Sequence, residues 1–170
     1  MVIAKSDAGV AAAEALSRAH ACELFLEAQG HRYLALLSGA LRDEPAWTLT
    51  PVELLFEGGH HGPEAGEWLF CVALWVPTDK RREFLRWYEY DHLPILLECP
   101  TWGGCRFVES PASHGCQFYA LHQLSERSAL ESPERARSRA GPAFERLKRF
   151  SWFDEPFTRT LYRRIDREHQ

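Results

Sequence analysis

The alternation of apolar and polar segments along the chain predicts several β-strands. The unbroken apolar run at 68–76 is too short for a typical helix and is rich in aromatic and β-branched residues, which indicates a strand buried on both faces. Two further runs, at 105–109 and 117–124, are joined by a stretch of turn-forming residues and predict a hairpin. A last strand is expected at 157–165.

A helix is predicted after the first of these strands. Thr78 or Asp79 can cap its amino end, and Pro94 is expected to break it. Three side chains recur at a spacing of four and therefore share one helix face: Phe84, Tyr88 and His92.

A second helix is predicted between the hairpin and the last strand. Ser132 followed by Pro133 is typical of a helix start, with the cap and the first-turn proline in their preferred places. The helical pattern is interrupted at 141–142 and resumes up to residue 150. The resulting order is βαββαβ, the ferredoxin-like plan.

The N-terminal half contains a shorter version of the same pattern. Residues 32–36 match 117–121 at an offset of 85, and 21–24 match 104–107 at nearly the same offset. The other expected parts are a remnant strand at 1–5, a helix at 11–19, a shrunken second helix near 41–47 and a strand at 50–55. We therefore predict an α+β chain of two ferredoxin-like units: a degenerate half at 1–57, a Gly-rich linker at 58–66 and a complete half at 67–170.

The segment 84–94 carries a family resemblance. It reads Phe-Leu-Arg-Trp-Tyr-Glu-Tyr-Asp-His-Leu-Pro, which is similar to the Phe-x-x-Trp-Tyr-x-x-Glu-His-Ile/Leu-Pro pattern of the EthD-like branch of the dimeric α+β barrel superfamily. The similarity covers 68–165 and, more weakly, 20–56. Asp91 stands where the family usually has Glu, and Thr101 where it usually has Gly.

The resemblance implies two four-stranded antiparallel sheets, with helices outside, that face one another around an apolar cavity. Relatives normally form this arrangement by homodimerisation. Here the two halves are expected to form it within one chain as a pseudo-dimer, and a further homodimer stays open. Relatives include muconolactone isomerases, polyketide cyclases, cofactor-free monooxygenases and haem-binding enzymes, so the resemblance implies a small-molecule site and not one reaction.

Composition excludes several classes of function. The net charge is −4, and the basic residues between 127 and 167 are interleaved with acidic ones, which is typical of a solvated helix face and not of a nucleic-acid interface. No apolar run approaches a membrane span, and the start resembles no signal peptide, so we expect a cytoplasmic protein. The five cysteines are odd in number and never spaced Cys-x-x-Cys, which indicates reduced thiols and no zinc site.

His92 is the leading catalytic candidate, because an imidazole can accept or release a proton near neutral pH. Tyr88, one turn earlier on the same face, can donate a hydrogen bond to a ligand oxygen. Asp91 is the third candidate, although successive helical side chains point about 100° apart. The alternatives are that His92 braces the helix end and that Tyr88 is a core aromatic.

A flat, hydrophobic ligand is expected beside these residues. Six aromatic side chains can line its pocket or fill an ordinary core: Trp68, Trp75, Trp87, Trp102, Phe118 and Tyr119. His122 is expected to be a satisfied or exposed histidine, and the pair at 60–61 lacks a third metal ligand. The leading hypothesis is a cofactor-free isomerase, lyase or cyclase acting on an aromatic or lactone-like molecule. The alternatives are a non-catalytic binding protein and a haem-binding protein.

Overall fold

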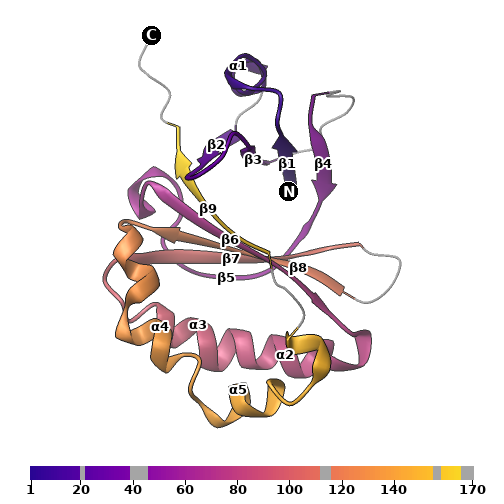
Figure 1. The fold of residues 1–170 in the computed structure, drawn as a ribbon, viewed down its shortest axis with the longest axis vertical. Coiled ribbons are helices and arrows are strands. Elements are labelled where there is room, and N and C mark those ends of the chain that lie inside the picture. Colours follow the sequence, from indigo (N-terminus) through magenta and orange to yellow (C-terminus); the bar gives the residue numbers. More distant parts are fainter. Residues whose placement is uncertain (20–21, 39–45, 112–115, 155–157, 166–170) are drawn as a thin grey trace.

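The computed structural model describes residues 1–19, 22–38, 46–111, 116–154 and 158–165, and it has an α+β fold (Figure 1). The strands are β1 (Val2–Ser6), β2 (Cys22–Glu27), β3 (Tyr33–Leu37), β4 (Thr48–Pro51), β5 (Glu53–Gly59), β6 (Trp68–Val76), β7 (Trp102–Ser110), β8 (Cys116–Leu124) and β9 (Thr158–Arg164). The α-helices are α1 (Val10–Ala19), α2 (Arg81–Trp87), α3 (Leu93–Leu96), α4 (Pro133–Arg137) and α5 (Pro142–Leu147).

The described strands form one hydrogen-bonded sheet of nine strands instead of the two separate sheets expected. Their order is β4-β1-β3-β2-β9-β6-β8-β7-β5, and neighbours are antiparallel. Strand β9 makes the sheet continuous, because it pairs with β6 through residues 158–163 and with β2 through residues 162–164. The order β1-β3-β2 in the N-terminal half is the same as β6-β8-β7 in the C-terminal half.

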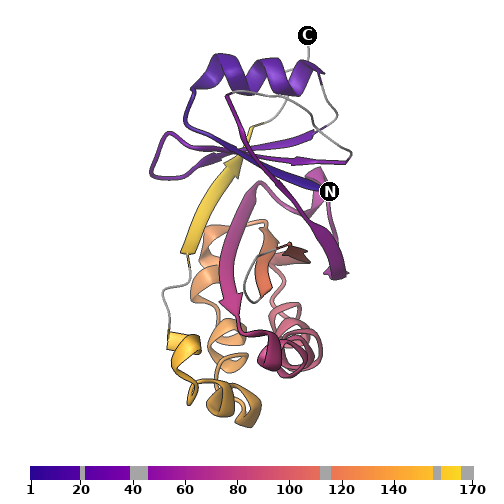
Figure 2. The ribbon, with the colours of Figure 1, turned by 90° about the vertical axis from the view of Figure 1, so that its right-hand side faces the viewer.

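The layers are arranged with helices on the outside. Helix α1 covers the N-terminal strands, and α2 to α5 cover the C-terminal strands (Figures 1 and 2). A buried cluster that includes Ile3, Phe25, Leu69, Val108 and Leu121 draws from both sets of strands and packs them against each other. A second cluster lies between the C-terminal strands and their helices. The chain therefore has apolar contacts on both faces of β6 to β8.

Most predicted elements are confirmed, including the strand at 68–76 and the hairpin of β7 and β8. The Ser132 hydroxyl accepts from the Arg135 amide at 3.2 Å, as expected for a cap of α4. The shrunken helix near 41–47 lies mostly outside the described residues. Strand β5 runs to Gly59, two residues into the predicted linker.

The helix through segment 84–94 differs from its prediction at both ends. It begins with a 3-10 turn at 78–80, and neither this turn nor α2 has a side-chain cap. Pro94 does not end the helix; it lies in the first turn of α3, which directly follows residue 92. Between α2 and α3 the chain makes a π-helical turn at Tyr88–His92.

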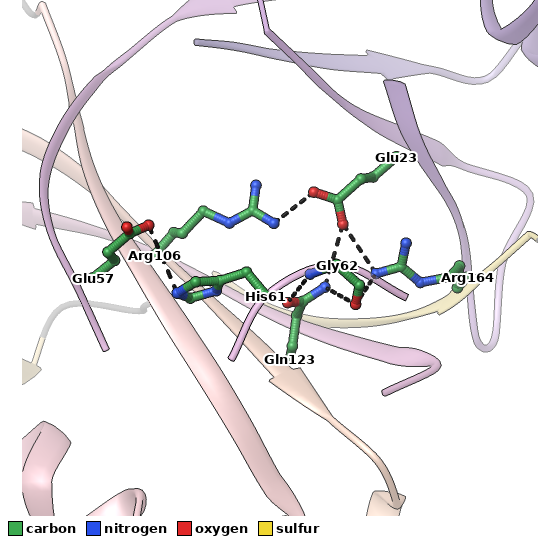
Figure 3. A network of polar contacts seen from close by, with 7 residues as sticks. All are labelled: Glu23, Glu57, His61, Gly62, Arg106, Gln123 and Arg164. Carbon is green, nitrogen blue, oxygen red and sulfur yellow. Dashed lines mark hydrogen bonds and ion pairs between the residues drawn. The ribbon is translucent and has the colours of Figure 1, made fainter. Parts of the chain in front are cut away.

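A network of charged and polar side chains ties the two halves together at one side of the sheet (Figure 3). The Glu23 carboxylate on β2 accepts hydrogen bonds from Arg106 at 2.5 Å, Arg164 at 3.0 Å and Gln123 at 3.3 Å, which lie on β7, β9 and β8. Burial alone would raise the pKa of Glu23, but the two arginines hold it below its usual value. The carboxylate therefore stays ionised and links the N-terminal half to three strands of the other half.

Candidate functional site

A cavity of about 320 Å³ lies between the C-terminal strands and their helices. This position differs from the one that the family resemblance implied, because the contact between the two sets of strands is packed with side chains. The described residues that line the cavity are Phe70, Val72, Leu74, Phe84, Trp87, Tyr88, His92, Leu96, Trp102, His122, Arg135, Arg139, Phe144, Lys148, Phe153 and Arg159. Its volume is at the lower end of the range for small-molecule sites.

The strands present alternate side chains to this cavity. Phe70, Val72 and Leu74 of β6 line it, in keeping with the two-residue period of a strand. Strand β7 would place residue 103 on this face, two positions before Cys105, but the register shifts between Trp102 and Gly104. The extra residue shifts the alternation of side chains between the two sheet faces by one position. The Trp102 side chain therefore lies on the helix-facing side.

The π-helical turn brings three rings together on the opposite wall. The ring centroids of Trp87 and His92 are 4.6 Å apart, and those of Tyr88 and His92 are 4.8 Å apart. Residues five apart are not neighbours on a regular α-helix, whereas the i to i+5 bonding of a π-turn widens the helix there. The imidazole of His92 is therefore held between the indole and the phenol.

His122 is hydrogen-bonded on both ring nitrogens. The Trp102 indole N–H donates to Nδ1 at 3.1 Å, and Nε2 lies 2.7 Å from the Tyr88 hydroxyl oxygen. An indole nitrogen can only donate, so Nδ1 must carry the lone pair and Nε2 the proton. His122 therefore donates to Tyr88, and the Tyr88 hydroxyl proton is left for another acceptor. Burial, with contributions from His92 and Arg135, lowers the pKa of His122 to about 3.

His92 is held in the opposite tautomer. Its Nδ1 lies 3.2 Å from the Ser138 carbonyl oxygen, which can only accept, so Nδ1 carries the proton and Nε2 the lone pair. Burial and the nearby charges of Arg139 and Arg135 lower the pKa of His92 to about 4, although the Ser138 bond opposes this shift. The imidazole is therefore neutral at pH 7 and can accept a proton or bind a metal through Nε2.

Tyr88 is neutral as well, because burial raises the pKa of its hydroxyl well above the usual value. The cavity thus has a hydrogen-bond donor in Tyr88 and a neutral base in His92 on one helix. Such a pair can take a proton from a carbon acid and stabilise the oxygen that becomes negative.

The structure brings some of the predicted site residues together and not others. His92, Tyr88, Trp87 and Trp102 line the cavity. The other predicted residues lie elsewhere. Asp91 is exposed on the outer side of the helix, Trp75 is 40% exposed, and Trp68 packs beside the cluster around Trp102. Phe118 is in the core behind the cavity, and Tyr119 faces the N-terminal strands. Phe118 and Tyr119, which are adjacent on β8, point to opposite faces of the sheet.

The basic residues at the cavity are the feature that the sequence interpretation missed, whereas His122 is a satisfied histidine, as expected, and also lines the cavity. His122 follows Phe118 by four residues on β8, so strand alternation places both on the helix-facing side. Arg135 and Arg139 are one turn apart in sequence and belong to a segment interpreted as a solvated face. Their spacing indicated a shared face but not that this face borders a cavity.

Among the described residues there is no group of three His, Cys, Asp or Glu side chains that could hold a metal ion. Cys71, Cys99 and Cys105 are buried free thiols. Within the part of the chain described, no helix is both long and apolar enough to cross a membrane.

No family model matches the sequence, and no curated protein sequence matches it significantly. Solved structures do resemble the fold. An anthrone oxidase-like protein has a TM-score of 0.67 at 11% identity, over 97% of this chain and 90% of its own. A monooxygenase-like protein of Listeria innocua has a TM-score of 0.67 at 11% identity, over 99% and 96%.

A haem-degrading enzyme of Listeria monocytogenes has a TM-score of 0.64 at 9% identity, over 96% of this chain and 99% of its own. Identities this low are evidence for the fold alone. The chain therefore shares the α+β fold of these structures.

Proposed function

We propose that this protein is a cofactor-independent enzyme of the isomerase, lyase or cyclase type that acts on an aromatic or lactone-like molecule. The observation that carries the proposal is the pairing of His92 and Tyr88 on the wall of an aromatic-lined cavity. His92 acts as general base and acid, and Tyr88 binds the ligand oxygen. Trp87 and Trp102 stack on a flat ring.

The proposed step is the removal of a proton from a carbon atom conjugated with a carbonyl group. Nε2 of His92 takes the proton, and the electron pair of the broken C–H bond moves to the carbonyl oxygen. The Tyr88 hydroxyl donates to that oxygen, because its own proton is not used by His122. Return of the proton to a different carbon completes an isomerisation, and loss of a leaving group completes an elimination.

Trp102 and His122 act as positioning residues in this scheme. Their hydrogen bonds fix the Tyr88 oxygen as an acceptor on one side, which orients its O–H bond toward the cavity. The Ser138 carbonyl does the same for His92 by fixing its tautomer. Preorganised donors of this kind reduce the reorganisation needed during reaction.

Anthrone is a suitable probe, since it is a flat carbon acid and one structural neighbour is described as anthrone oxidase-like. We expect the protein to accelerate exchange of the anthrone methylene protons in deuterated buffer under nitrogen, followed by NMR. His92→Gln should lower this exchange by about 10²–10⁴-fold. His31→Gln, at an exposed histidine, is the matched control and should leave the rate unchanged.

Two alternatives predict different results. A non-catalytic binding protein would bind anthrone, with quenching of tryptophan fluorescence, and would not accelerate exchange. If the His92→Gln variant exchanges the anthrone protons as fast as the natural protein, the role given to His92 is refuted.

Haem binding is the second alternative, and the neutral Nε2 of His92 at the cavity favours it. His92 would then hold the haem iron through Nε2, and basic residues at the cavity would hold the propionates. A haem would supply redox chemistry at that position. A Soret band in protein supplied with haem, lost in His92→Gln, would support this alternative over the cofactor-free one.

The assembly that we propose is a pseudo-dimer of two ferredoxin-like copies within the chain, the C-terminal one EthD-like by its segment 84–94. The equal strand orders β1-β3-β2 and β6-β8-β7 support it, as does the apolar contact between the halves. A fragment of residues 67–170 should expose this apolar surface and aggregate or self-associate in sedimentation experiments. A stable, cooperative monomer of that fragment would contradict the proposal.

A further inference from the structure

Basic side chains gather at the edge of the cavity. Four basic residues line it: Arg135 of α4, Arg139 two residues after that helix, Lys148 after α5 and Arg159 of β9. None of the described lining residues is acidic. Arg135 is half-buried, whereas the other three are exposed, so the charges form a rim around an aromatic interior. A rim with one sign of charge focuses the electrostatic field into the cavity.

The basic residues of the rim are close enough to affect one another. Burial lowers the pKa of Arg135, and the charges of Arg139 and Arg159 lower it further. The charge of Arg139 likewise contributes to a lowered pKa of Arg159. Bringing like charges together in a partly buried site costs free energy unless an anion offsets them. An anionic ligand at the rim would offset the repulsion between Arg135 and Arg139.

We propose that the ligand of this cavity is an aromatic carboxylate, whose ring lies among the aromatic side chains and whose carboxylate is held at the rim by Arg135 and Arg139. The inference deepens the proposed function, since it concerns the same cavity. A guanidinium group matches a carboxylate through two parallel hydrogen bonds, which favours this anion for a planar ligand.

The contacts of the two arginines agree with this assignment. One Arg135 nitrogen, Nη1, donates to the Leu130 carbonyl at 2.5 Å, which anchors the side chain. Arg139 lies 5.7 Å above the centroid of the Phe144 ring, a residue that itself lines the cavity. Each guanidinium is therefore placed by a contact that leaves further N–H groups able to bind a ligand.

A bound carboxylate also has a consequence for His92. The charges of Arg139 and Arg135 contribute to the low pKa of His92, so an anion beside them raises that pKa toward neutrality. The other titratable or charged residues that face the same cavity are Tyr88, His122, Lys148 and Arg159. The ligand would then bring His92 closer to the pKa that suits proton transfer near pH 7.

The test uses two probes with the same ring, 2-naphthoate and the neutral 2-naphthamide. Binding to the full chain is measured at pH 7 by calorimetry and by quenching of tryptophan fluorescence, because Trp87 and Trp102 line the cavity. We expect 2-naphthoate to bind at least about tenfold more tightly than the amide. The difference should shrink as salt is added, because salt screens exposed charges.

Variants identify the residues responsible. Arg135→Gln and Arg139→Gln should each weaken 2-naphthoate binding about fivefold or more and leave 2-naphthamide binding unchanged. Arg146→Gln is the matched control, because it removes the same charge from α5 at an exposed position that does not line this cavity. The amide also reports whether a variant keeps a folded cavity.

Any of three results would overturn the inference. They are equal affinity for the two probes, absence of 2-naphthoate binding, and equal losses of 2-naphthoate affinity in all three arginine variants. The proposed function can fail separately. If 2-naphthoate binds as expected and His92→Gln leaves anthrone exchange unchanged, the carboxylate site stands and the catalytic role of His92 falls. A rise of the His92 pKa when 2-naphthoate binds, followed by NMR, would link the carboxylate site to the proton transfer proposed for His92.

Discussion

Acidification from pH 7 to pH 5 is expected to lower the free energy of unfolding by about 4 kcal/mol, because His92 and His122 are buried as neutral imidazoles. Their pKa values are about 4 and about 3 in the folded protein, against 6.5 for an unperturbed histidine. Both residues are therefore neutral in the folded state at pH 5, whereas the unfolded chain binds nearly two protons there.

The sign follows from proton linkage. The folded pKa values are lowered, so the contribution of these histidines is complete above about pH 6.5 and is lost as the pH falls. Each unit of pH between the unfolded and folded values costs about 1.4 kcal/mol per histidine. From pH 7 to pH 5 this gives about 2 kcal/mol for each. The result at pH 5 depends little on how far below 5 the folded pKa values lie.

The assay is urea unfolding at pH 7, 6 and 5, followed by tryptophan fluorescence and circular dichroism. His122→Gln keeps a side chain that can accept from Trp102 and donate to Tyr88, but it does not titrate, so its loss between pH 7 and 5 should be about half that of the natural protein. His31→Gln, at an exposed site, should show the full loss. A change below about 1 kcal/mol in the natural protein, or an unchanged loss in His122→Gln, would refute the reasoning.

Three further substitutions test other contacts. Tyr88→Phe removes the acceptor of the buried His122 N–H and should lower the free energy of unfolding by about 1–3 kcal/mol. Tyr90→Phe is the control, because its side chain is 67% exposed, and it should change that free energy by less than about 0.5 kcal/mol in the same urea titration. Glu23→Gln leaves two arginines with a neutral partner and should cost about 3 kcal/mol, measured by calorimetry; an unchanged melting temperature would contradict the role given to this network. Ser132→Ala removes the cap of α4 and should cost about 1 kcal/mol, and Ser132→Thr should restore most of it.

The order of strands and helices was predictable because apolar runs and turn residues are local signals. The run at 68–76 coincides with β6, and the spacing of Phe84, Tyr88 and His92 does place them together. The π-turn was not predictable, since nothing in the spacing separates it from a regular helix that Pro94 ends. The pairing of β9 with both halves also depends on contacts between distant segments.

The candidate site was predictable only in part. The motif indicated His92 and Tyr88, but Phe118 and Tyr119 are adjacent on a strand and cannot both face one cavity. Trp102 reaches the cavity because of a one-residue shift in β7, at a position where a Cβ on Gly103 would lie 2.1 Å from the Ala65 carbonyl oxygen. Such a shift depends on close backbone contact, which has no signature in the spacing of apolar residues.

Strand β9 has a consequence for the order in which the protein can fold during its synthesis. Because β9 pairs with β2, the sheet of the N-terminal half keeps an open edge until residue 164 has left the ribosome. The ribosome adds roughly 5–20 residues each second, so β2 waits several seconds for its partner. During that interval the exposed edge of β2 can pair with another nascent chain. A chaperone that shields strand edges would therefore raise the yield of this protein more than one that acts after release.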